Sequence, residues 1–106
     1  MALVATLLTF AVPNAMHDAA ERMNRWQIVR PYNAKLERMA WCESRGRWHI
    51  ATGNGFFGGL QFDARTWRSV GGRGLPHWHS PLEQKFRAVL LIRRRGFAPW
   101  PVCGRA

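Results

Sequence analysis

Apolar side chains recur at helical spacing in the first third of the chain. Between Asn14 and Val29 they fall every three or four residues, at Ala19, Met23, Trp26 and Val29. This periodicity predicts an amphipathic helix, with Asn14 as a candidate N-cap and Pro31 as the residue that stops it. Such a helix either packs on the rest of the chain or acts as a tether.

A second helix is predicted to begin at Asn33, as its N-cap, and to run to about Ser44. Gly46 is expected to end it, because glycine readily adopts the left-handed conformation found after helices. The side chains expected to face inward are Leu36, Met39 and Ala40.

A third helix has the clearest start in the chain. Ser80-Pro81-Leu82-Glu83 offers Ser as N-cap, Pro at the first helical position and Glu at the third. The helix should run to about Arg95, where Arg93-Arg94-Arg95 complements the helix dipole and Gly96 provides the cap. The tail that follows, residues 98–103, should be extended by its prolines. The side chains expected inside are Leu82, Phe86, Val89 and Leu90.

The segment between the second and third predicted helices is rich in glycine and aromatic residues. Thr52-Gly53-Asn54-Gly55 is a turn signal, and the flanking aromatic and aliphatic residues predict a small hairpin. Gly58-Gly59 would allow the backbone to approach another segment or a ligand closely. Asp63 is expected to cap a short helix that includes Val70. Together the elements predict an α+β, mainly α fold with a short β-hairpin.

The length of 106 residues allows one small domain. We expect a leader and amphipathic helix over residues 1–32 and a domain over 33–106. Residues 2–12 are apolar and too few to span a bilayer, and Pro13 follows them. This pattern is typical of the apolar region of a secretory signal, and export is the favoured interpretation. An apolar first helix, or the end of a longer leader, would give the same pattern.

The charge balance is strongly basic, with 16 Lys and Arg against 6 Asp and Glu and a net charge of +10. Such a field favours polyanionic partners, such as nucleic acid, an acidic glycan or an anionic envelope. A GC-rich genome would produce the same excess of arginine without selection for a partner. The 47% hydrophobic content is enough to fill a core and argues against global disorder.

The two cysteines, Cys42 and Cys103, fit a single disulfide better than a zinc site, which needs closely spaced Cys and His pairs. The bridge would close a loop of roughly sixty residues, worth about 4 kcal/mol in the chain-entropy model, and would imply an oxidising compartment. His77 and His79 have no evident third ligand and are expected at the surface, with substrate contact as the lesser alternative. No metal and no cofactor are expected.

Six carboxyl groups limit the possible acid–base chemistry. Glu43 falls in the last turn of its predicted helix, where the dipole disfavours its charged form and Trp41 and Trp48 would desolvate it. Both effects would raise its pKa, as a general acid near neutral pH requires. In the alternative, Glu43 pairs with Arg45 or Arg47 at the surface. The six residues are Asp18, Glu21, Glu37, Glu43, Asp63 and Glu83.

A long, nearly contiguous series of residues carries a family resemblance. It comprises Cys42-Glu43-Ser44, Gly46, Trp48, Ile50, the run from Thr52 to Phe62, Thr66-Trp67 and the closing Trp100-Pro101-Val102-Cys103-Gly104. These residues resemble the core domain of the resuscitation-promoting factors, over about residues 34–104. The resemblance implies a small lysozyme-like domain, related to lytic transglycosylases, that acts on bacterial peptidoglycan. It also implies secretion by an actinobacterium, or delivery to the cell wall by one of its phages.

The resemblance also assigns roles to individual residues. The family's catalytic acid corresponds to Glu43, its disulfide to Cys42–Cys103, and a substrate-binding threonine to Thr66. Several positions depart from the family pattern, which bears on substrate preference more than on the type of reaction. They are Leu36, Arg45, Arg47, His49 and Ala51.

We therefore expect an enzyme that cleaves the β-1,4 bond between N-acetylmuramic acid and N-acetylglucosamine, by hydrolysis or transglycosylation, with Glu43 as general acid. Asp63 is the candidate for a second carboxylate. In the alternative, a single acid acts with assistance from the sugar's own groups and leaves an anhydro product. The expected substrate-binding residues are Trp48, Thr52, Asn54, Phe56, Phe57, Gln61, Asp63, Thr66 and Trp67. For Phe56, Phe57 and Trp67, a place in the core is the alternative to stacking on sugars.

Two other classes of function compete with the enzyme. A non-catalytic peptidoglycan-binding module would use the same aromatic cleft and basic rim. A nucleic-acid binder ranks last, because the sequence has no recognisable reading helix or stacking platform. The expected partner is peptidoglycan, with other cell-wall hydrolases as further candidates. We expect a monomer with no specific nucleic-acid binding and no stable membrane span.

Overall fold

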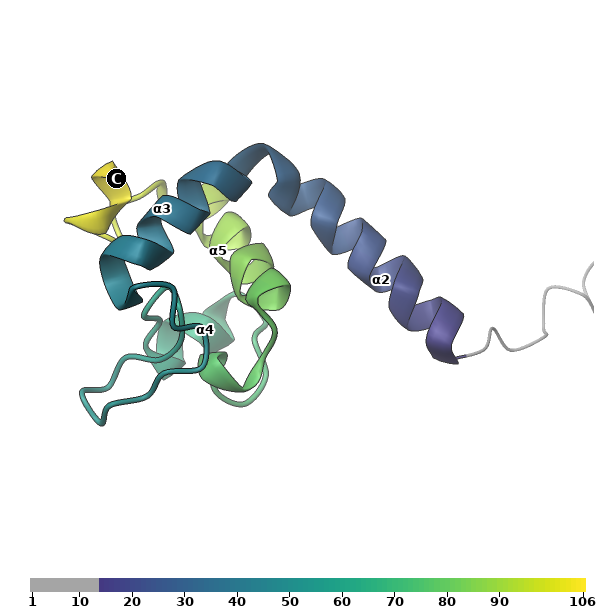
Figure 1. Cartoon of the computed structure of the whole chain (residues 1–106), viewed down its shortest axis with the longest axis horizontal. Helices are drawn as coiled ribbons and strands as arrows, with labels where there is room; N and C mark the ends of the chain where they lie inside the picture. The colour runs from purple at the N-terminus through teal and green to yellow at the C-terminus, as the bar shows by residue number, and fades with distance from the viewer. Residues whose placement is uncertain (1–13) are drawn as a thin grey trace, which may run out of the picture.

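The structure is a computed structural model that describes residues 14–106, so the predicted leader over residues 2–12 lies outside the described residues. Within this range the protein is mainly helical (Figure 1). Four α-helices and three short 3-10 helices follow one another as α2 (Asn14–Val29), η1 (Arg30–Tyr32), α3 (Asn33–Ser44), α4 (Ala64–Ser69), η2 (Pro76–Trp78), α5 (Pro81–Arg95) and η3 (Cys103–Arg105).

The predicted bounds of α3 and α5 are confirmed, and so is the start of α5. The Ser80 hydroxyl accepts a hydrogen bond from the Glu83 amide at 3.1 Å, and Gly96 ends the helix with a φ of 61°. The end of α3 differs in detail. Arg45 already takes the left-handed conformation, with a φ of 59°, and Gly46 follows it.

The prediction that Asn33 caps α3 is wrong. Tyr32 holds the N-cap position without a side-chain cap, and Asn33 Oδ1 accepts a hydrogen bond from Lys85 Nζ at 2.8 Å. The reason is that Pro31 does not end the helical path but tightens it into η1. The Asn33 amide therefore donates to the Arg30 carbonyl and needs no side-chain partner.

The core lies between α3, α4, α5 and the loops that join them. Leu36, Met39 and Ala40 of α3 are buried as predicted, while Leu82 and Leu90 of α5 are only partly buried. The largest fully buried apolar side chains, which anchor the core, are Trp67, Leu36, Met39, Leu60, Val29 and Val89.

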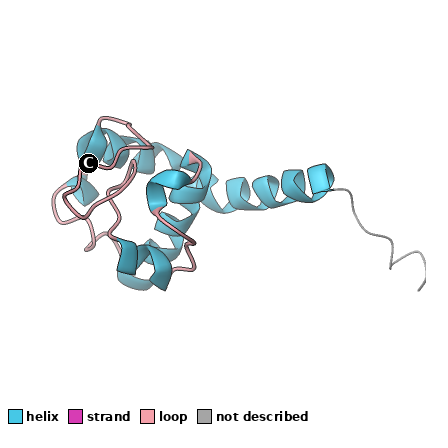
Figure 2. Cartoon of the chain, turned by 90° about the horizontal axis from the view of Figure 1, so that it is seen from below, coloured by secondary structure: helices cyan, strands magenta, loops and turns pink. Residues whose placement is uncertain are grey.

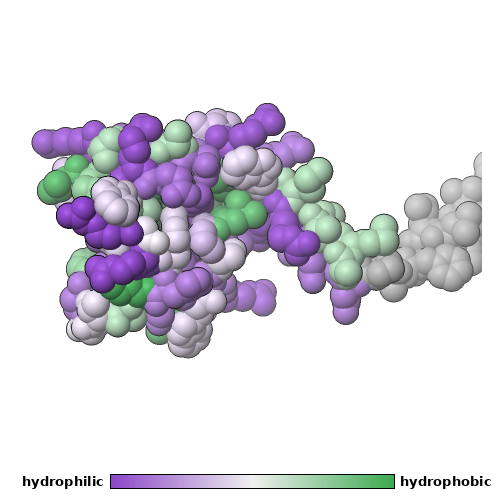
Figure 3. Space-filling view, viewed as in Figure 1, coloured by the Kyte–Doolittle hydropathy of each residue, from purple (hydrophilic) through white to green (hydrophobic). Residues whose placement is uncertain are grey.

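Helix α2 extends away from this body in both ribbon views (Figures 1 and 2). Only its last turn enters the core, through Val29, while Met23 is 63% exposed and Trp26 41% exposed. The apolar stripe of the predicted amphipathic helix is therefore mostly open to solvent, and apolar side chains are visible along α2 in Figure 3. Within residues 14–106 no helix has the length and apolarity needed to cross a membrane.

The predicted hairpin is reduced to two isolated antiparallel bridges, Ala51 with Phe57 and Phe57 with Phe62. What holds this segment instead is Gln84, a fully buried residue of α5. Its Oε1 accepts from the Gly59 amide at 3.0 Å, and its Nε2 donates to the Trp48 carbonyl at 2.8 Å and the His79 carbonyl at 2.9 Å.

The close approach predicted at Gly58-Gly59 is confirmed. A Cβ atom on Gly58 would collide with the Gln84 side chain, and one on Gly59 would collide with the Trp48 ring. Gly58 also has a φ of 81°, which side-chain-bearing residues rarely adopt. Two glycines are therefore required where the loop crosses α5.

The C-terminal tail is folded into turns, so the prediction of an extended tail is wrong. The Trp100 amide donates to the Phe97 carbonyl at 2.9 Å, and the Gly104 amide donates to the Trp100 carbonyl at 2.8 Å. The predicted disulfide is confirmed, with an S–S distance of 2.02 Å and a Cα–Cα distance of 5.6 Å between Cys42 and Cys103. It ties η3 to the last turn of α3.

Candidate active site

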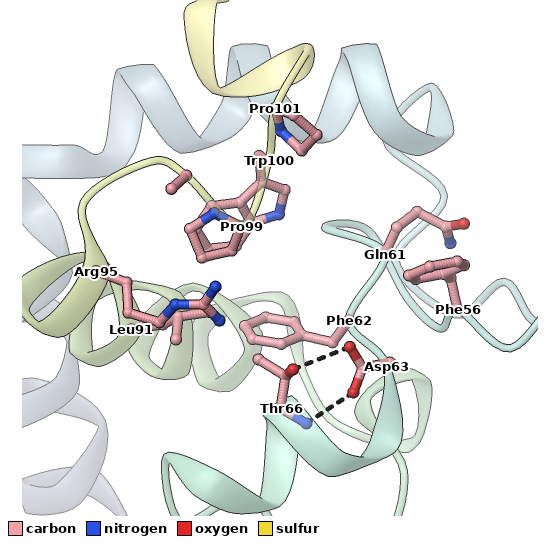
Figure 4. A pocket seen from close by; sticks show the side chains of 11 residues that line it. Phe56, Gln61, Phe62, Asp63, Thr66, Leu91, Arg95, Pro99, Trp100 and Pro101 are labelled. Carbon is pink, nitrogen blue, oxygen red and sulfur yellow. Dashed lines mark hydrogen bonds between the residues drawn. The ribbon is translucent and has the colours of Figure 1, made fainter.

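Two neighbouring hollows share a wall and together form what we call the groove. The shared wall consists of Phe56, Gln61, Pro99, Trp100 and Pro101. One hollow, of about 430 Å³, contains Glu43. The other, of about 340 Å³, contains Asp63 and Thr66 (Figure 4). Each is within the size range of small-ligand sites, and side by side they form an elongated site.

Glu43 lies half-buried in the last turn of α3, against the tail that carries Cys103. Desolvation by burial raises the pKa of its carboxyl. The carboxyl forms no ion pair or side-chain hydrogen bond with any of residues 14–106. An acid of this kind holds its proton to higher pH than an ordinary glutamate.

The two arginines that could have paired with Glu43 are engaged elsewhere. The Arg45 guanidinium lies 5.3 Å from the centre of the Trp41 ring, and Arg47 Nε donates to the Ser44 carbonyl at 2.8 Å. The surface pairing considered from the sequence is therefore not present. The expected source of desolvation also differs, because Trp41 is exposed and Trp48 lines neither hollow.

The backbone around Glu43 is fixed from two sides. On one side is the bridge between the preceding Cys42 and Cys103. On the other, the buried Ser44 hydroxyl donates to the Gly59 carbonyl at 2.9 Å and accepts from the Arg47 amide at 3.1 Å. The end of α3 is thus held against both the tail and the glycine loop that border the groove.

Asp63 has the opposite environment to Glu43. Its Oδ1 accepts from the Thr66 amide at 2.7 Å, and its Oδ2 accepts from the Thr66 hydroxyl at 2.9 Å (Figure 4). The hydrogen bond from the Thr66 amide is the main reason that the pKa of Asp63 is lowered. Asp63 is thus an ionised N-cap of α4, as the sequence predicted, and both its oxygens are occupied.

The structure brings only some of the sequence-predicted site residues to the groove. Phe56, Gln61, Asp63 and Thr66 line it together with Glu43. Phe56 is 46% exposed and presents its ring to the groove. Gln61 has an unusual φ of 53° and donates from Nε2 to the Gly58 carbonyl at 3.0 Å, which leaves its Oε1 available as an acceptor.

The other predicted binding residues lie elsewhere. Trp67 has no exposed surface and packs edge-on against Phe62, so it supports the groove from below rather than offering a face to a sugar. Phe57 stacks on His77, with ring centres 5.2 Å apart. Trp48 packs on Gly59, and Thr52 and Asn54 are exposed and line neither hollow.

The two histidines near Trp78 take part in local contacts. His49 and the His77 carbonyl share a hydrogen bond at 2.9 Å, and His79 Nε2 lies 2.6 Å from the Arg73 carbonyl. Among residues 14–106, no three His, Cys, Asp or Glu side chains gather as a metal site would need.

One wall of the groove, formed by Pro99, Trp100 and Pro101, was not among the site residues predicted from the sequence. Trp100 is 4% exposed, and its Nε1 donates to the Leu60 carbonyl at 2.9 Å. One signal could have found this wall. Since Cys42 directly precedes Glu43, the residues next to Cys103 must lie beside Glu43 once the bridge forms.

Comparison with known proteins shows which family the chain belongs to. The family model of a transglycosylase-like domain matches residues 30–103. The chain is 49% identical over 69 residues to the resuscitation-promoting factor of Micrococcus luteus, an overlap that covers 65% of this chain and 31% of that protein. It is 47% identical over 74 residues to the resuscitation-promoting factor RpfE of Mycobacterium tuberculosis, covering 70% of this chain and 43% of that protein.

A third relative extends the pattern. The chain is 43% identical over 70 residues to the resuscitation-promoting factor RpfC of Mycobacterium tuberculosis, covering 66% of this chain and 50% of that protein. The chain thus spans between about a third and a half of the length of these relatives. Because the family model matches more than half of its residues, the chain belongs to the family of transglycosylase-like domains, and its domain resembles the core of the resuscitation-promoting factors.

Proposed function

We propose that this protein cleaves the glycan strands of bacterial peptidoglycan, at the β-1,4 bond between N-acetylmuramic acid and N-acetylglucosamine. Glu43 acts as the general acid and donates its proton to the glycosidic oxygen as the bond breaks. The observation that carries the proposal is the Glu43 carboxyl, half-buried in a groove, with a raised pKa and no ion pair among residues 14–106. The family membership supports the choice of peptidoglycan.

We further propose that the reaction uses a single acid. Glycosidases with two carboxylates use the second one as a nucleophile or as a base for water. Glu43 and Asp63 are the two carboxyl residues of the groove among residues 14–106, and Asp63 directs both oxygens to Thr66. With Asp63 occupied in this way, the sugar's own groups assist the reaction, and the product is an anhydro sugar.

The other groove residues have roles that follow from their chemistry. Gln61 and Thr66 hydrogen-bond the acetamido or hydroxyl groups of the glycan. Phe56 offers an exposed ring on which a sugar face stacks. Trp100 and its flanking prolines form a rigid wall that keeps water away from Glu43.

The experiment that tests this proposal measures soluble fragments released from purified actinobacterial cell walls. Glu43→Gln should lower the rate by about 10²–10⁴-fold, the usual contribution of a general acid. Glu21→Gln, which removes an exposed carboxyl of α2 outside the groove, is the matched control and should keep the wild-type rate. Equal release by wild type and Glu43→Gln would exclude Glu43 from the reaction.

Two further measurements separate the alternatives. Mass spectrometry of the fragments should find anhydro ends, whereas reducing ends would indicate hydrolysis. Asp63→Asn should change the rate only a few-fold, because asparagine also caps helices, whereas a loss as large as that of Glu43→Gln would make Asp63 the second carboxylate. Cell-wall binding without any released fragments from the wild type would favour a non-catalytic binding module.

A further inference from the structure

We propose that Arg95 is a substrate-recognition residue that binds a carboxylate carried by the glycan. The inference rests on the proposed function, because it assigns a ligand group to the groove in which Glu43 lies. It concerns the hollow beside the one that contains Glu43. In this proposal Arg95 selects among glycans by their charge, and Glu43 takes part in the bond cleavage itself.

Arg95 is the last residue of α5, and its side chain lines the hollow that contains Asp63 and Thr66. In Figure 4 it reaches from the end of the helix, alongside Leu91, into this hollow. The preceding arginines of the run are placed differently. Arg94 donates to the Ser69 carbonyl at 2.8 Å, and Arg93 lines neither hollow. Arg95 is thus the one cation, among residues 14–106, in the wall of the groove.

The Arg95 guanidinium is free to bind a ligand. It forms no ion pair and no side-chain hydrogen bond with any of residues 14–106. Asp63, the one acidic residue lining the same hollow within that range, directs both oxygens to Thr66. By contrast, Arg25 and Arg87 both donate to Glu83.

A carboxylate is the group that fits this arginine best. The planar guanidinium donates two parallel hydrogen bonds to a carboxylate, which adds orientation to charge attraction. Without a cation beside it, the ionised Asp63 would repel an anionic ligand from this hollow. Arg95 therefore makes the hollow suitable for a sugar that carries a negative group.

Peptidoglycan offers such a group, and oligomers of N-acetylglucosamine do not. N-acetylmuramic acid carries a lactyl carboxyl group, which is either free or joined to a peptide stem that has carboxylates of its own. Both sources present the same chemistry to Arg95. Arg95 lies in the hollow adjoining that of Glu43. The recognised sugar is therefore placed next to the glycosidic oxygen that accepts the proton.

The test measures binding by the full chain carrying Glu43→Gln, so that no ligand is consumed. The three probes are an oligomer of N-acetylglucosamine, an alternating glycan with free lactyl carboxylates, and the same glycan with peptide stems. Adding Arg95→Gln should weaken binding of the carboxylate-bearing glycans about tenfold, as expected for one charge-assisted hydrogen-bonded contact at a partly exposed site. Binding of the uncharged oligomer should not change, and the glycan that loses affinity identifies the source of the carboxylate.

Two variants control the experiment. Arg93→Gln removes the same charge from the same helix outside the groove and should leave all three affinities unchanged. Arg95→Lys keeps the charge without the planar fork and should restore only part of the affinity. Equal weakening of all three probes by Arg95→Gln, no weakening of any, or no binding of either carboxylate-bearing glycan would overturn the inference. A lower unfolding midpoint with unchanged selectivity would show that Arg95 only balances the charge of Asp63.

Failure of this inference is distinguishable from failure of the proposed function. If the wild type releases no fragments from cell walls but Arg95→Gln still selectively loses the carboxylate-bearing glycans, the proposed reaction is wrong and the role of Arg95 holds. If fragments are released with unchanged charge selectivity, the reaction holds and the role of Arg95 is wrong.

Discussion

Glu43 in the groove and Glu83 at the joint between α2 and α5 are both half-buried, yet their pKa values change in opposite directions. Burial raises the pKa of Glu43, and no cation among residues 14–106 forms an ion pair that would oppose it. Burial would also raise the pKa of Glu83, but hydrogen bonds from Arg25 Nε at 2.9 Å and Arg87 Nε at 2.8 Å outweigh it and lower the pKa. The difference lies in the partners and not in the depth of burial.

This contrast separates groups that hold the fold together from groups available for chemistry. At the joint, Arg25 also lies 4.4 Å from the centre of the Phe86 ring. Nearby on α5, Lys85 contacts both Asn33 and Glu37 of α3. In the groove, the half-buried Glu43 and the exposed Arg95 are left without such partners among residues 14–106. Ionisable groups without partners in a groove are candidates for function, and this is why we propose roles for both.

The largest expected effect comes from removing the covalent tie of the groove. Replacing both Cys42 and Cys103 by serine should lower the free energy of unfolding by about 4 kcal/mol, because the unfolded chain regains the freedom of the closed loop. Urea unfolding of the oxidised wild type and the double variant measures this loss. Hydrogen exchange should show the first loss of protection in η3 and the end of α3, with the joint between α2 and α5 retained. An unchanged unfolding midpoint would show that packing alone holds the tail.

The second-largest effect is expected from replacing Gln84, which connects α5 to the loops beside the groove. Gln84→Leu should cost about 2–4 kcal/mol, since it keeps the volume but leaves the Gly59 amide and the carbonyls of Trp48 and His79 without partners. Gln27→Leu, at an exposed position on α2, is the control and should change stability little. Urea unfolding of both variants provides the comparison, and equal midpoints would mean that water replaces the lost partners.

The third-largest effect is expected from replacing Glu83, the paired carboxyl of the joint. Glu83→Gln should lower the free energy of unfolding at pH 7 by about 1–2 kcal/mol, since Arg25 and Arg87 lose their acceptor in a partly buried site. The pKa of Glu83 is lower in the folded state, so its stabilisation is present above the ordinary glutamate pKa and is lost as the pH falls through the folded value. The free energies of unfolding of the two proteins should therefore converge as the pH falls through the folded-state pKa of Glu83. A constant difference across this range would contradict the ion-pair explanation.

The smallest effect has the opposite sign and concerns the unpaired carboxyl of the groove. The folded-state pKa of Glu43 is raised, so the wild type loses stability as the pH rises from the ordinary glutamate pKa through the folded value. Glu43→Gln should therefore raise the free energy of unfolding at pH 7 to 8 by less than about 1 kcal/mol, because solvent screens the exposed part of the group. At about pH 4 the gain should vanish, since Glu43 is then largely protonated in the folded state. A midpoint that falls at neutral pH would mean that the carboxylate has a stabilising partner.

Much of the local structure could be predicted because short-range chemistry determines it. Ser80 and Asp63 cap their helices as expected, since a hydroxyl or carboxylate three residues before a free amide forms that bond locally. The disulfide followed from there being two cysteines. The prediction failed at Asn33, where the 3-10 turn η1 satisfies the Asn33 amide and Lys85 binds its side chain. It also failed in the tail after Phe97, where Trp100 is fixed by a hydrogen bond to the distant Leu60 carbonyl.

The groove could be predicted only in part. Glu43, Phe56, Gln61, Asp63 and Thr66 were expected near one another and line one groove, although their roles in catalysis and binding are still proposals. The aromatic residues could not be sorted by sequence. A tryptophan such as Trp67 has the same pattern whether it faces a sugar or the core, and only its packing distinguishes the two.

The sequence by itself determined the positions of the helices, the caps at Asp63 and Ser80, and the bridge, because each depends on neighbouring residues or on a single possible pairing. Only the tertiary structure decided which carboxyl is paired and which is not. Glu43 and Glu83 have the same side chain, but their pKa values change in opposite directions. Arg87, four residues along α5, is a local partner of Glu83, and Arg25 reaches Glu83 across a long stretch of chain. The tail around Trp100 borders the hollow of Glu43 and offers it no charge. Long-range placement of charge is a property of the packed molecule, and local sequence preferences do not encode it.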